Sequence, residues 1–317
     1  MNTFVRRPTG VLGLGARVSA ASLLSGTVSV IMVVYRTGPA LYESIRRVLA
    51  DPMTDEFVVV DNGSSPEEAR WLDAAAAADR RMKLLRGQGN VGFARGANMG
   101  ALASSGRVLV FLNPDAFLED GCLQSLTEAL ALAPSPRMVG ARVLNADGSE
   151  QRGARRGELT PVTTFLSLTR LSRVGLFRRF EVHQEHAPTP CGRERVATIS
   201  GACFAMTRED FSAMGGFDES YFLHVEDVDL CWRVRQSGGA VLFDPRARVT
   251  HLGSTSLKAP VLVEYWKGVG LARYFRKRAN NTRRRILAIC MTPLIVGVSV
   301  LRPLLRGQVL RRKPRSA

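Results

Sequence analysis

Three carboxylates occupy four consecutive positions in the second half of the chain: Glu226, Asp227 and Asp229. They fall in the first turn of a helix predicted over Val225–Gln236, where acidic side chains stabilise the helix dipole. Three acids are more than the helix dipole requires. Their negative charges also repel one another, so a further role must offset the repulsion. A carboxylate at a helix N-terminus stays ionised, so it accepts a proton more readily than it donates one, which suits a general base.

A second polar set stands where predicted strands end. Asn113, Pro114 and Asp115 follow the apolar run VLVFL, and His251 follows a later run. One interpretation is a simple turn, since all three residue types favour turns. The other is a Mg²⁺ or Mn²⁺ site with Asp115 as a ligand and substrate phosphates as the rest. His251 could add a ligand, although a lone histidine is more often structural.

Alternating strands and helices must position these groups. The predicted strands of the first half are Val28–Tyr35, Phe57–Val60, Met82–Leu85 and Val108–Leu112, with helices opening at Pro39 and Pro66 and after the loop that begins at Asn90. Such alternation predicts a parallel sheet with right-handed crossovers. Ligands bind at the carboxyl ends of such strands, so Asp61 and Asp115 should face one crevice.

The second half is less regular. Strands are predicted at Val139–Leu144 and Ala197–Met206, and further strand segments at Ala240–Phe243 and Arg248–Thr250. The Arg-rich stretch Gly153–Arg195 is long for a connection inside a compact domain, so we expect part of it to be a functional loop or lid.

The charge of the chain is concentrated at its C-terminus. The 317 residues carry a net charge of +16, and the segment from Ser256 to the end holds 15 Lys/Arg and one acid, Glu264, or +14 of that total. The body is therefore nearly neutral and offers no basic groove, so nucleic acid is not an expected partner. The five cysteines form no C-x-x-C pair, which argues against a zinc site or disulfide framework and fits a reducing cytoplasm.

The basic tail also contains an apolar run. Ile286–Leu301 has 16 residues without a charge and contains Pro293, which we expect to break it. A membrane-spanning helix needs about 20 apolar residues, so the run is too short. Arg283–Arg285 precede it, and Arg302, Arg306 and Arg311–Lys313 follow. This pattern favours a helix lying in an anionic membrane interface; a helix packed on the core is the main alternative, and a marginal membrane span is a third.

Six sequence blocks together resemble a known family. They are VVVDNGSS (58–65), GNVGFARGANMG (89–100), FLNPDAFL (111–118), ISGACFAMTR (199–208), GGFDESYFLHVEDVDLCWRVRQSGG (215–239) and VTHLGSTS (249–256). Their order and content resemble glycosyltransferase family 2, and most closely its rhamnosyltransferase-like subgroup. The resemblance covers about Val28 to Ser256.

The resemblance implies an α/β protein of the GT-A fold, with a mostly parallel central sheet flanked by helices. We expect a flexible extension at 1–27 and a catalytic domain at 28–256, with a nucleotide-binding half (28–115) and an acceptor half (116–256). Residues 257–317 would form basic, partly apolar, membrane-associating helices.

The resemblance also implies roles for individual residues. Asp227 matches the catalytic base, with Glu226 as second choice, and Asp115 matches the metal ligand, assisted by His251. Asn113 replaces the first Asp of the family's DxD motif and would face the ribose or donor sugar. Asp61 would accept a hydrogen bond from the nucleotide base. The remaining expected site residues are Asn90, Gly92, Phe93, Arg95 and Asn98 on the donor side, and Asp218 and Trp232 on the acceptor side.

The expected function is therefore inverting, metal-dependent transfer of a sugar to an acceptor hydroxyl. Rhamnose from a dTDP- or UDP-linked donor is the first choice, with a lipid-linked saccharide as acceptor. The enzyme would be cytoplasmic and peripheral at the inner face of the plasma membrane. A nucleotidyltransferase is a second hypothesis, but Arg36–Pro39 after the first strand is too sparse to cradle a triphosphate. A non-catalytic membrane-surface binding protein is a third.

Overall fold

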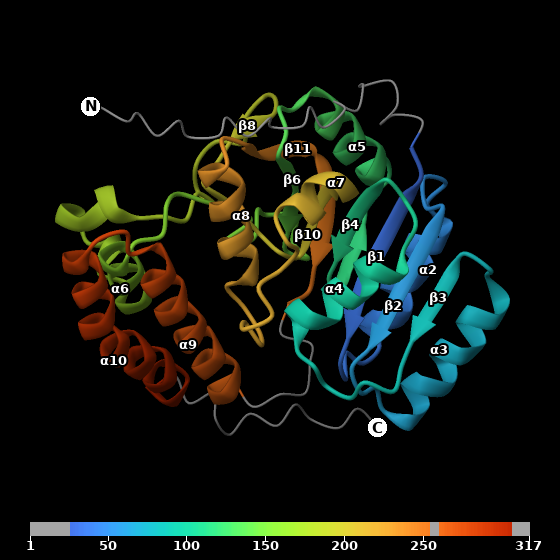
Figure 1. Ribbon diagram of the computed structural model, residues 1–317, viewed down its shortest axis with the longest axis horizontal. Helices are drawn as coiled ribbons and strands as arrows, with labels where there is room; N and C mark the ends of the chain where they lie inside the picture. The colour runs from blue at the N-terminus through green and yellow to red at the C-terminus, as the bar shows by residue number, and fades with distance from the viewer. Residues whose placement is uncertain (1–25, 254–259, 306–317) are drawn as a thin grey trace, which may run out of the picture.

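The computed structural model describes residues 26–253 and 260–305. A central sheet carries helices on both faces, and a separate group of helices stands at the end of the molecule away from β3 (Figure 1). The expected α/β fold is confirmed. The flexible extension predicted at 1–27 lies almost wholly outside the described residues, as do 254–259 and the basic residues after position 305.

Nine of the described strands form the large sheet, in the order β3-β2-β1-β4-β10-β6-β11-β5, with β8 also on β11. They are β1 (Val28–Val34), β2 (Glu56–Asp61), β3 (Met82–Leu85), β4 (Val108–Leu112), β5 (Ala116–Leu118), β6 (Arg137–Leu144), β8 (Glu194–Arg195), β10 (Cys203–Thr207) and β11 (Ala240–His251). β7 (Arg155–Arg156) and β9 (Thr198–Ile199) form a small second sheet.

The sheet is parallel in its first half and mixed beyond it. β1 pairs in parallel with β2 and β4, which brings the carboxyl ends of these strands to one edge. β10 runs antiparallel to both β4 and β6. The single strand predicted over Ala197–Met206 is wrong, because a turn at Ser200–Ala202 separates β9 from β10. The two segments predicted after Gly239 form one strand, β11, with a register shift between Asp244 and Arg248.

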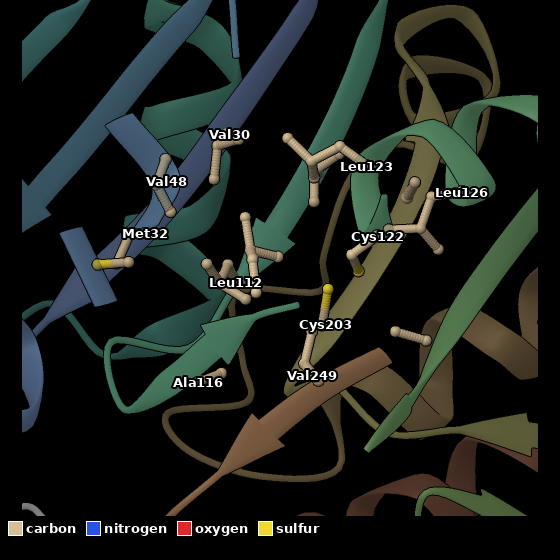
Figure 2. Packing of buried hydrophobic residues seen from close by; sticks show 14 of the residues in the cluster. Val30, Met32, Val48, Leu112, Ala116, Cys122, Leu123, Leu126, Cys203 and Val249 are labelled. Atoms are coloured by element: carbon tan, nitrogen blue, oxygen red, sulfur yellow. The ribbon is translucent and has the colours of Figure 1, made fainter. Parts of the chain in front are cut away.

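The helices on the sheet are α2 (Ala40–Ala50), α3 (Pro66–Ala78), α4 (Phe93–Ala103), α5 (Cys122–Leu132), α7 (Arg208–Ala213) and α8 (Glu226–Gln236). Side chains alternate across β1, so Val30 and Met32 join the core under α2 and α5, which Figure 2 shows. Ile31 and Val33 face the opposite core, beneath α4 and α8. Both faces of the strand are therefore buried, as its apolar run predicts.

Three further helices form what we call the helical layer: α6 (Pro161–Thr169), α9 (Pro260–Arg278) and α10 (Thr282–Leu305). A third apolar cluster joins this layer to α8 through Val228, Tyr274 and Ile295, among others. Gly270 of α9 permits the close approach, because a Cβ there would lie 3.1 Å from the His224 carbonyl oxygen. The predicted break at Pro293 is wrong, since α10 continues through it.

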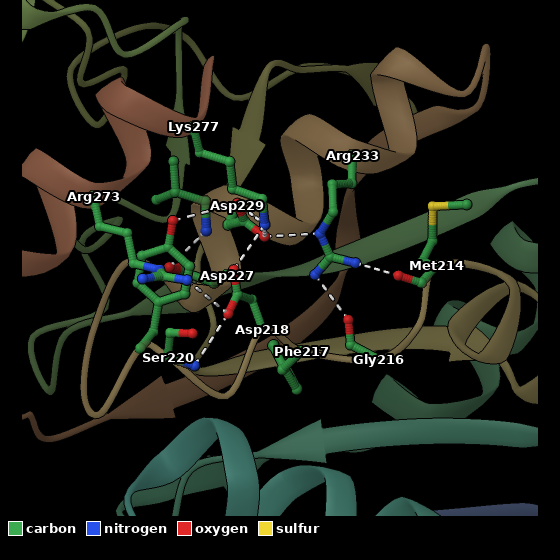
Figure 3. Close-up of polar contacts among 12 residues, drawn as sticks. Met214, Gly216, Phe217, Asp218, Ser220, Asp227, Asp229, Arg233, Arg273 and Lys277 are labelled. Carbon is green, nitrogen blue, oxygen red and sulfur yellow. Dashed lines mark hydrogen bonds and ion pairs between the residues drawn. The ribbon is translucent and has the colours of Figure 1, made fainter. Parts of the chain in front are cut away.

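A buried ion-pair network also fixes α9 to α8. The Asp229 carboxylate is fully buried and accepts hydrogen bonds from Arg233 Nε (2.7 Å) and Lys277 Nζ (3.0 Å). Lys277 Nζ also donates to Asp218 Oδ2 at 2.9 Å, and Figure 3 shows this cluster of charges. Asp229 therefore has a structural role, which accounts for one of the three clustered acids.

Replacing Asp229 by Ala should destabilise the fold by about 3 kcal/mol, because it leaves two half-buried cations, Arg233 and Lys277, without their shared buried partner. Thermal or urea unfolding measures this change. Glu43→Gln, which removes the surface ion pair with Arg46 on α2, is the matched control and should cost less than about 1 kcal/mol. Equal effects of the two substitutions would contradict the structural role of Asp229.

Candidate active site

The Asp227 carboxylate is held in place at the first turn of α8. Its Oδ2 accepts hydrogen bonds from the Gly201 backbone N–H (2.9 Å) and from Arg156 Nη2 (3.1 Å). The preceding residues His224 and Val225 have positive φ angles of 67° and 74°. A β-branched residue rarely adopts that conformation, and such strain is concentrated at functional sites. The side chain remains 14% exposed, so it can reach a ligand.

Glu226, the neighbouring acid, has a different environment. Burial, together with the nearby charge of Asp227, raises its pKa to about 8. Near neutral pH this carboxyl group therefore holds its proton for much of the time. A protonated carboxylic acid is a poor base, so the structure favours Asp227 over Glu226 as the proton acceptor.

A cavity of about 280 Å³ opens beside Asp227. It lies between α8, with the segments beside it, and the helical layer. Its walls come from the segment after β6, from α6, α8 and α9, and from the turn before β10. The lining residues are Arg152, Gly153, Arg156, Leu159, Thr164, Ser167, Leu168, Val182, His183, Ser200, His224, Val225, Asp227, Val228, Lys267 and Leu271.

The second polar set also comes together at the end of β4. His251 Nε2 lies 3.1 Å from Asp115 Oδ1 and 3.4 Å from Asn113 Nδ2. Asp115 is buried, and its backbone oxygen accepts a hydrogen bond from the Leu252 N–H. The predicted convergence of Asn113, Asp115 and His251 is therefore present in the structure.

Gln151 determines how His251 presents its ring. The side-chain amide of Gln151 donates to the His251 carbonyl oxygen (3.0 Å) and to Asn145 Oδ1 (3.2 Å), so its Oε1 is an acceptor. His251 Nδ1 lies 2.7 Å from that oxygen and therefore carries the proton in the neutral ring. The lone pair of Nε2 then points toward Asp115 Oδ1, which is also an acceptor.

Two acceptors that face each other at 3.1 Å are compatible when a proton or a metal cation lies between them. Two ligands on adjacent vertices of an octahedral Mg²⁺ site lie about 3.0 Å apart, given metal–oxygen bonds of about 2.1 Å. The residues present therefore fit a divalent cation. Residues 26–253 and 260–305 contain no cluster of three or more Asp, Glu, His or Cys side chains able to hold a metal, so a ligand such as a diphosphate would have to complete the coordination.

The turn at Ser200–Ala202 connects the two parts of the site. The Gly201 N–H bonds to Asp227, and the carbonyl oxygen of the next residue, Ala202, accepts from the Asn113 N–H at 2.8 Å. The candidate base and the Asn113–Asp115 segment are thus held by backbone groups of two adjacent residues, Gly201 and Ala202.

Asp61 lies at the carboxyl end of β2, as predicted, and is buried. Its Oδ1 accepts from the backbone N–H groups of Gly63 and Ser64, and its Oδ2 accepts from Arg86 Nε at 2.9 Å. A carboxylate oxygen can accept a second hydrogen bond, so a base N–H at Oδ2 is geometrically possible. Its role in binding the nucleotide base stays a prediction.

The predicted donor loop is held between two segments. The Gly92 carbonyl oxygen accepts from Asn62 Nδ2, and the Phe93 N–H donates to the Phe222 carbonyl oxygen, both at 2.9 Å. Within the loop, Asn90 Oδ1 accepts from the Gly92 N–H at 3.2 Å. The loop therefore contacts the segment that leads into α8.

Asn98 and Arg95, which follow in α4, differ from each other. Asn98 exchanges two 2.9 Å hydrogen bonds with the backbone of Phe217, so it fixes the turn before α8. The Arg95 side chain is 60% exposed, and its Nε lies 3.9 Å from Glu219 Oε2. Arg95 can reach a ligand, whereas Asn98 has a structural use that the sequence did not indicate.

Gly92→Ala should disrupt the donor loop. The residue has a φ of 84°, and a Cβ would lie 2.6 Å from the Phe222 carbonyl oxygen. We expect a loss of about 1–3 kcal/mol in the free energy of unfolding and weaker donor binding, measured by thermal unfolding and calorimetry. Gly89→Ala is the control, because it has a φ of 65° but nothing within 4 Å of its Cβ. If both variants bind donor equally well, the Phe222 contact is not important.

The structure places Asp218 and Trp232 against α9 instead of along the cavity. Burial alone would raise the pKa of Asp218, but hydrogen bonds from Lys277 and Ser220 hold it below its usual range. Trp232 packs edge-on against Tyr274. Their expected acceptor-side roles gain no support from these contacts.

Sequence reasoning missed the residues that hold Asp227 and His251 in place. Arg156 lies in the Arg-rich stretch after position 152, which the sequence indicated as functional without identifying a residue. Gln151 and Gly201 gave no signal of their own, because their contacts join residues far apart in the chain.

The fold and the match to a known family define the class: a glycosyltransferase of the GT-A fold. The model of glycosyl transferase family 2 matches residues 29–214, and the chain belongs to that family.

Two relatives illustrate the range of similarity. An uncharacterized protein of Sinorhizobium fredii is 29% identical over 208 residues, which is 63% of this chain but only 21% of the relative. The chain thus spans about a fifth of that relative's length. An N-acetylglucosaminyl-diphospho-decaprenol L-rhamnosyltransferase of Mycobacterium tuberculosis is 25% identical over 253 residues, covering 72% of this chain and 76% of the relative.

Two solved structures share the fold. GalNAc-T7 with UDP, GalNAc and Mn²⁺ has a TM-score of 0.57 at 17% identity, covering 89% of this chain and 57% of that one. A mannosyltransferase from Pyrobaculum calidifontis with GDP-Man and Mn²⁺ has a TM-score of 0.56 at 15% identity, covering 89% and 75%. These likenesses confirm the expected GT-A fold.

Proposed function

We propose that the protein transfers a sugar, with inversion, from a dTDP- or UDP-linked donor to a hydroxyl of a lipid-linked saccharide. The observation that carries this proposal is the position of Asp227, an oriented carboxylate on the wall of the cavity. Asp227 accepts the proton of the acceptor hydroxyl as its oxygen forms a bond to the anomeric carbon. The bond from that carbon to the diphosphate oxygen breaks on the opposite side, which inverts the centre. One carboxylate suffices for this step.

Asp115 and His251 are the residues that would hold a divalent cation. Bound there, Mg²⁺ or Mn²⁺ would neutralise the charge that develops on the departing diphosphate. Mn²⁺ in both solved relatives supports this assignment. The His251 ring is kept in the required tautomer by Gln151.

Rhamnose is the proposed sugar, and a saccharide on a polyprenyl diphosphate is the proposed acceptor. The support is the name of the mycobacterial relative, an L-rhamnosyltransferase. This chain aligns with 76% of that relative's length. A screen of nucleotide sugars by thermal shift with Mn²⁺ tests the donor, because a bound ligand at 100 times its Kd stabilises the fold by about 2.7 kcal/mol. Stabilisation by GDP-mannose but by neither dTDP-rhamnose nor a UDP-sugar would overturn the donor assignment.

We further propose peripheral attachment to the inner face of the plasma membrane through the helical layer. Within the described residues, one helical stretch, Thr282–Leu301, is long and apolar enough to cross a membrane, with a mean hydropathy of 1.7, and 17% of it is buried. It packs one face on the protein through Ala288 and Ile295 and exposes Ile286 and Ile289 on another. Because its packing partner α9 is rich in charge, we favour a helix that lies in the interface over one that spans it.

Ile286→Asn combined with Ile289→Asn should weaken binding to anionic phosphatidylglycerol vesicles by about tenfold or more, since two exposed apolar side chains no longer enter the lipid. Vesicle sedimentation measures the effect. Leu102→Asn is the control, because Leu102 is 87% exposed but lies on α4, outside the helical layer. Unchanged binding of the double variant would exclude α10 as the attachment surface.

A further inference from the structure

Basic side chains outnumber acidic ones in the lining of the cavity beside Asp227. Arg152, Arg156 and Lys267 line it, against one carboxylate, Asp227 itself. Arg156 already pairs with Asp227 at 3.1 Å. Arg152 Nη2 donates to Ser167 Oγ at 3.2 Å. Its nearest acids, Glu181 and Glu185, lie at 3.8 and 3.9 Å, beyond hydrogen-bonding distance. Lys267 Nζ lies 4.0 Å from Glu264 Oε1.

The cavity also contains buried polar atoms for which the described residues provide no hydrogen-bond partner. They include Thr164 Oγ1, on a residue that is only 4% exposed, and His183 Nδ1. Buried polar groups are almost always paired, so such atoms indicate a missing ligand. Burial, together with the nearby charges of Arg152 and Arg156, lowers the pKa of His183 to about 3, so the ring is neutral and can donate or accept.

The position of this cavity relates it to the membrane. Thr164 belongs to α6 and Lys267 to α9, and both helices pack with α10 in the helical layer. The same layer exposes Ile286 and Ile289. A group bound between Thr164 and Lys267 would therefore contact the same helical layer that is proposed to face lipid.

We propose that this cavity binds the phosphate or diphosphate through which the acceptor saccharide is joined to its lipid. Arg152 and Lys267 pair with the phosphate charge, and Thr164 Oγ1 donates a hydrogen bond to a phosphate oxygen. Charge-assisted hydrogen bonds of this kind are about twice as strong as neutral ones. This inference rests on the proposed function, and it names the anionic group that anchors the acceptor with its hydroxyl toward Asp227.

Binding of geranyl diphosphate to the full-length protein tests the inference, with geraniol as the uncharged comparison. The titration is made calorimetrically in EDTA, so that a divalent cation cannot recruit the diphosphate to Asp115 and His251. We expect geranyl diphosphate to bind at least about tenfold more tightly than geraniol. Arg152→Gln and Lys267→Gln should each remove about tenfold of that affinity.

Three further variants complete the design. Arg152→Lys keeps the charge and should keep most of the affinity, and Arg70→Gln, on the exposed face of α3, should change nothing. Thr164→Val removes only the hydroxyl and provides the test if a charge variant fails to fold. Equal binding of the diphosphate and the alcohol would overturn the inference, as would wild-type affinity in the folded cavity variants.

A separate measurement distinguishes this failure from failure of the proposed function. Thermal shift with dTDP- and UDP-sugars and Mn²⁺ reports on the donor site alone. Donor stabilisation without diphosphate binding would overturn the cavity assignment only. Diphosphate binding without donor stabilisation would overturn the proposed transfer reaction and leave an anion-binding cavity.

Discussion

Asp227→Asn is expected to lower the rate of sugar transfer by about 10²–10⁴-fold, which is the contribution of a general base. The amide cannot take up the proton of the acceptor hydroxyl. It retains an oxygen that can accept from Arg156 or Gly201, so the fold and donor binding should persist. Release of nucleoside diphosphate measures the rate, and thermal shift with donor verifies binding.

Glu226→Gln provides the matched control for this prediction. The raised pKa of Glu226 means that its side chain is largely neutral near pH 7, and glutamine resembles that neutral form. We therefore expect less than about a tenfold loss of rate. If Glu226→Gln abolished transfer while Asp227→Asn left it intact, the roles of the two acids would be reversed.

The second large effect is expected at Asp115. Asp115→Ala should reduce transfer by about 10²–10³-fold, the range typical of losing one electrostatic stabiliser of a developing charge. The variant should also need a higher concentration of Mn²⁺ or Mg²⁺ for half-maximal rate. A titration of rate against Mn²⁺ measures both effects.

Gln151→Ala should also raise the concentration of Mn²⁺ needed for half-maximal rate, but with a smaller loss of rate than Asp115→Ala. The substitution removes the acceptor that orients His251, and loss of such an outer partner typically costs about 10–100-fold in metal affinity. Its maximal rate at saturating Mn²⁺ should stay closer to wild type than that of Asp115→Ala. For both predictions, one outcome would contradict a cation at this site: Asp115→Ala with wild-type activity in the presence of EDTA.

The elements of the first half could be predicted because each has a local cause. α3 begins at Pro66, as predicted, behind a Ser65 capping box, and β4 matches its apolar run VLVFL. α5 was missed although Leu123, Leu126 and Leu130 have helical spacing and are buried. α6 was missed because it lies within an Arg-rich stretch with little apolar periodicity.

The candidate site was predictable where residues lie at strand or helix ends. Asp115 and His251 meet because β5 and β11 pair, and their convergence followed from the family resemblance, not from spacing. The Gly201–Asp227 bond could not be predicted, because it depends on a turn that interrupts an apparent strand. The cavity could not be predicted either, since it forms only when the helical layer packs against α8.

The most direct test of the proposed reaction is an assay with dTDP-rhamnose, Mn²⁺ and N-acetylglucosamine on a short polyprenyl diphosphate. Nucleoside diphosphate release and the anomeric configuration of the product are measured together. We predict one nucleoside diphosphate per glycosidic bond, with a configuration opposite to that of the donor, and no product from Asp227→Asn. Release of pyrophosphate, retention of configuration, or donor binding without transfer to any acceptor would contradict the account.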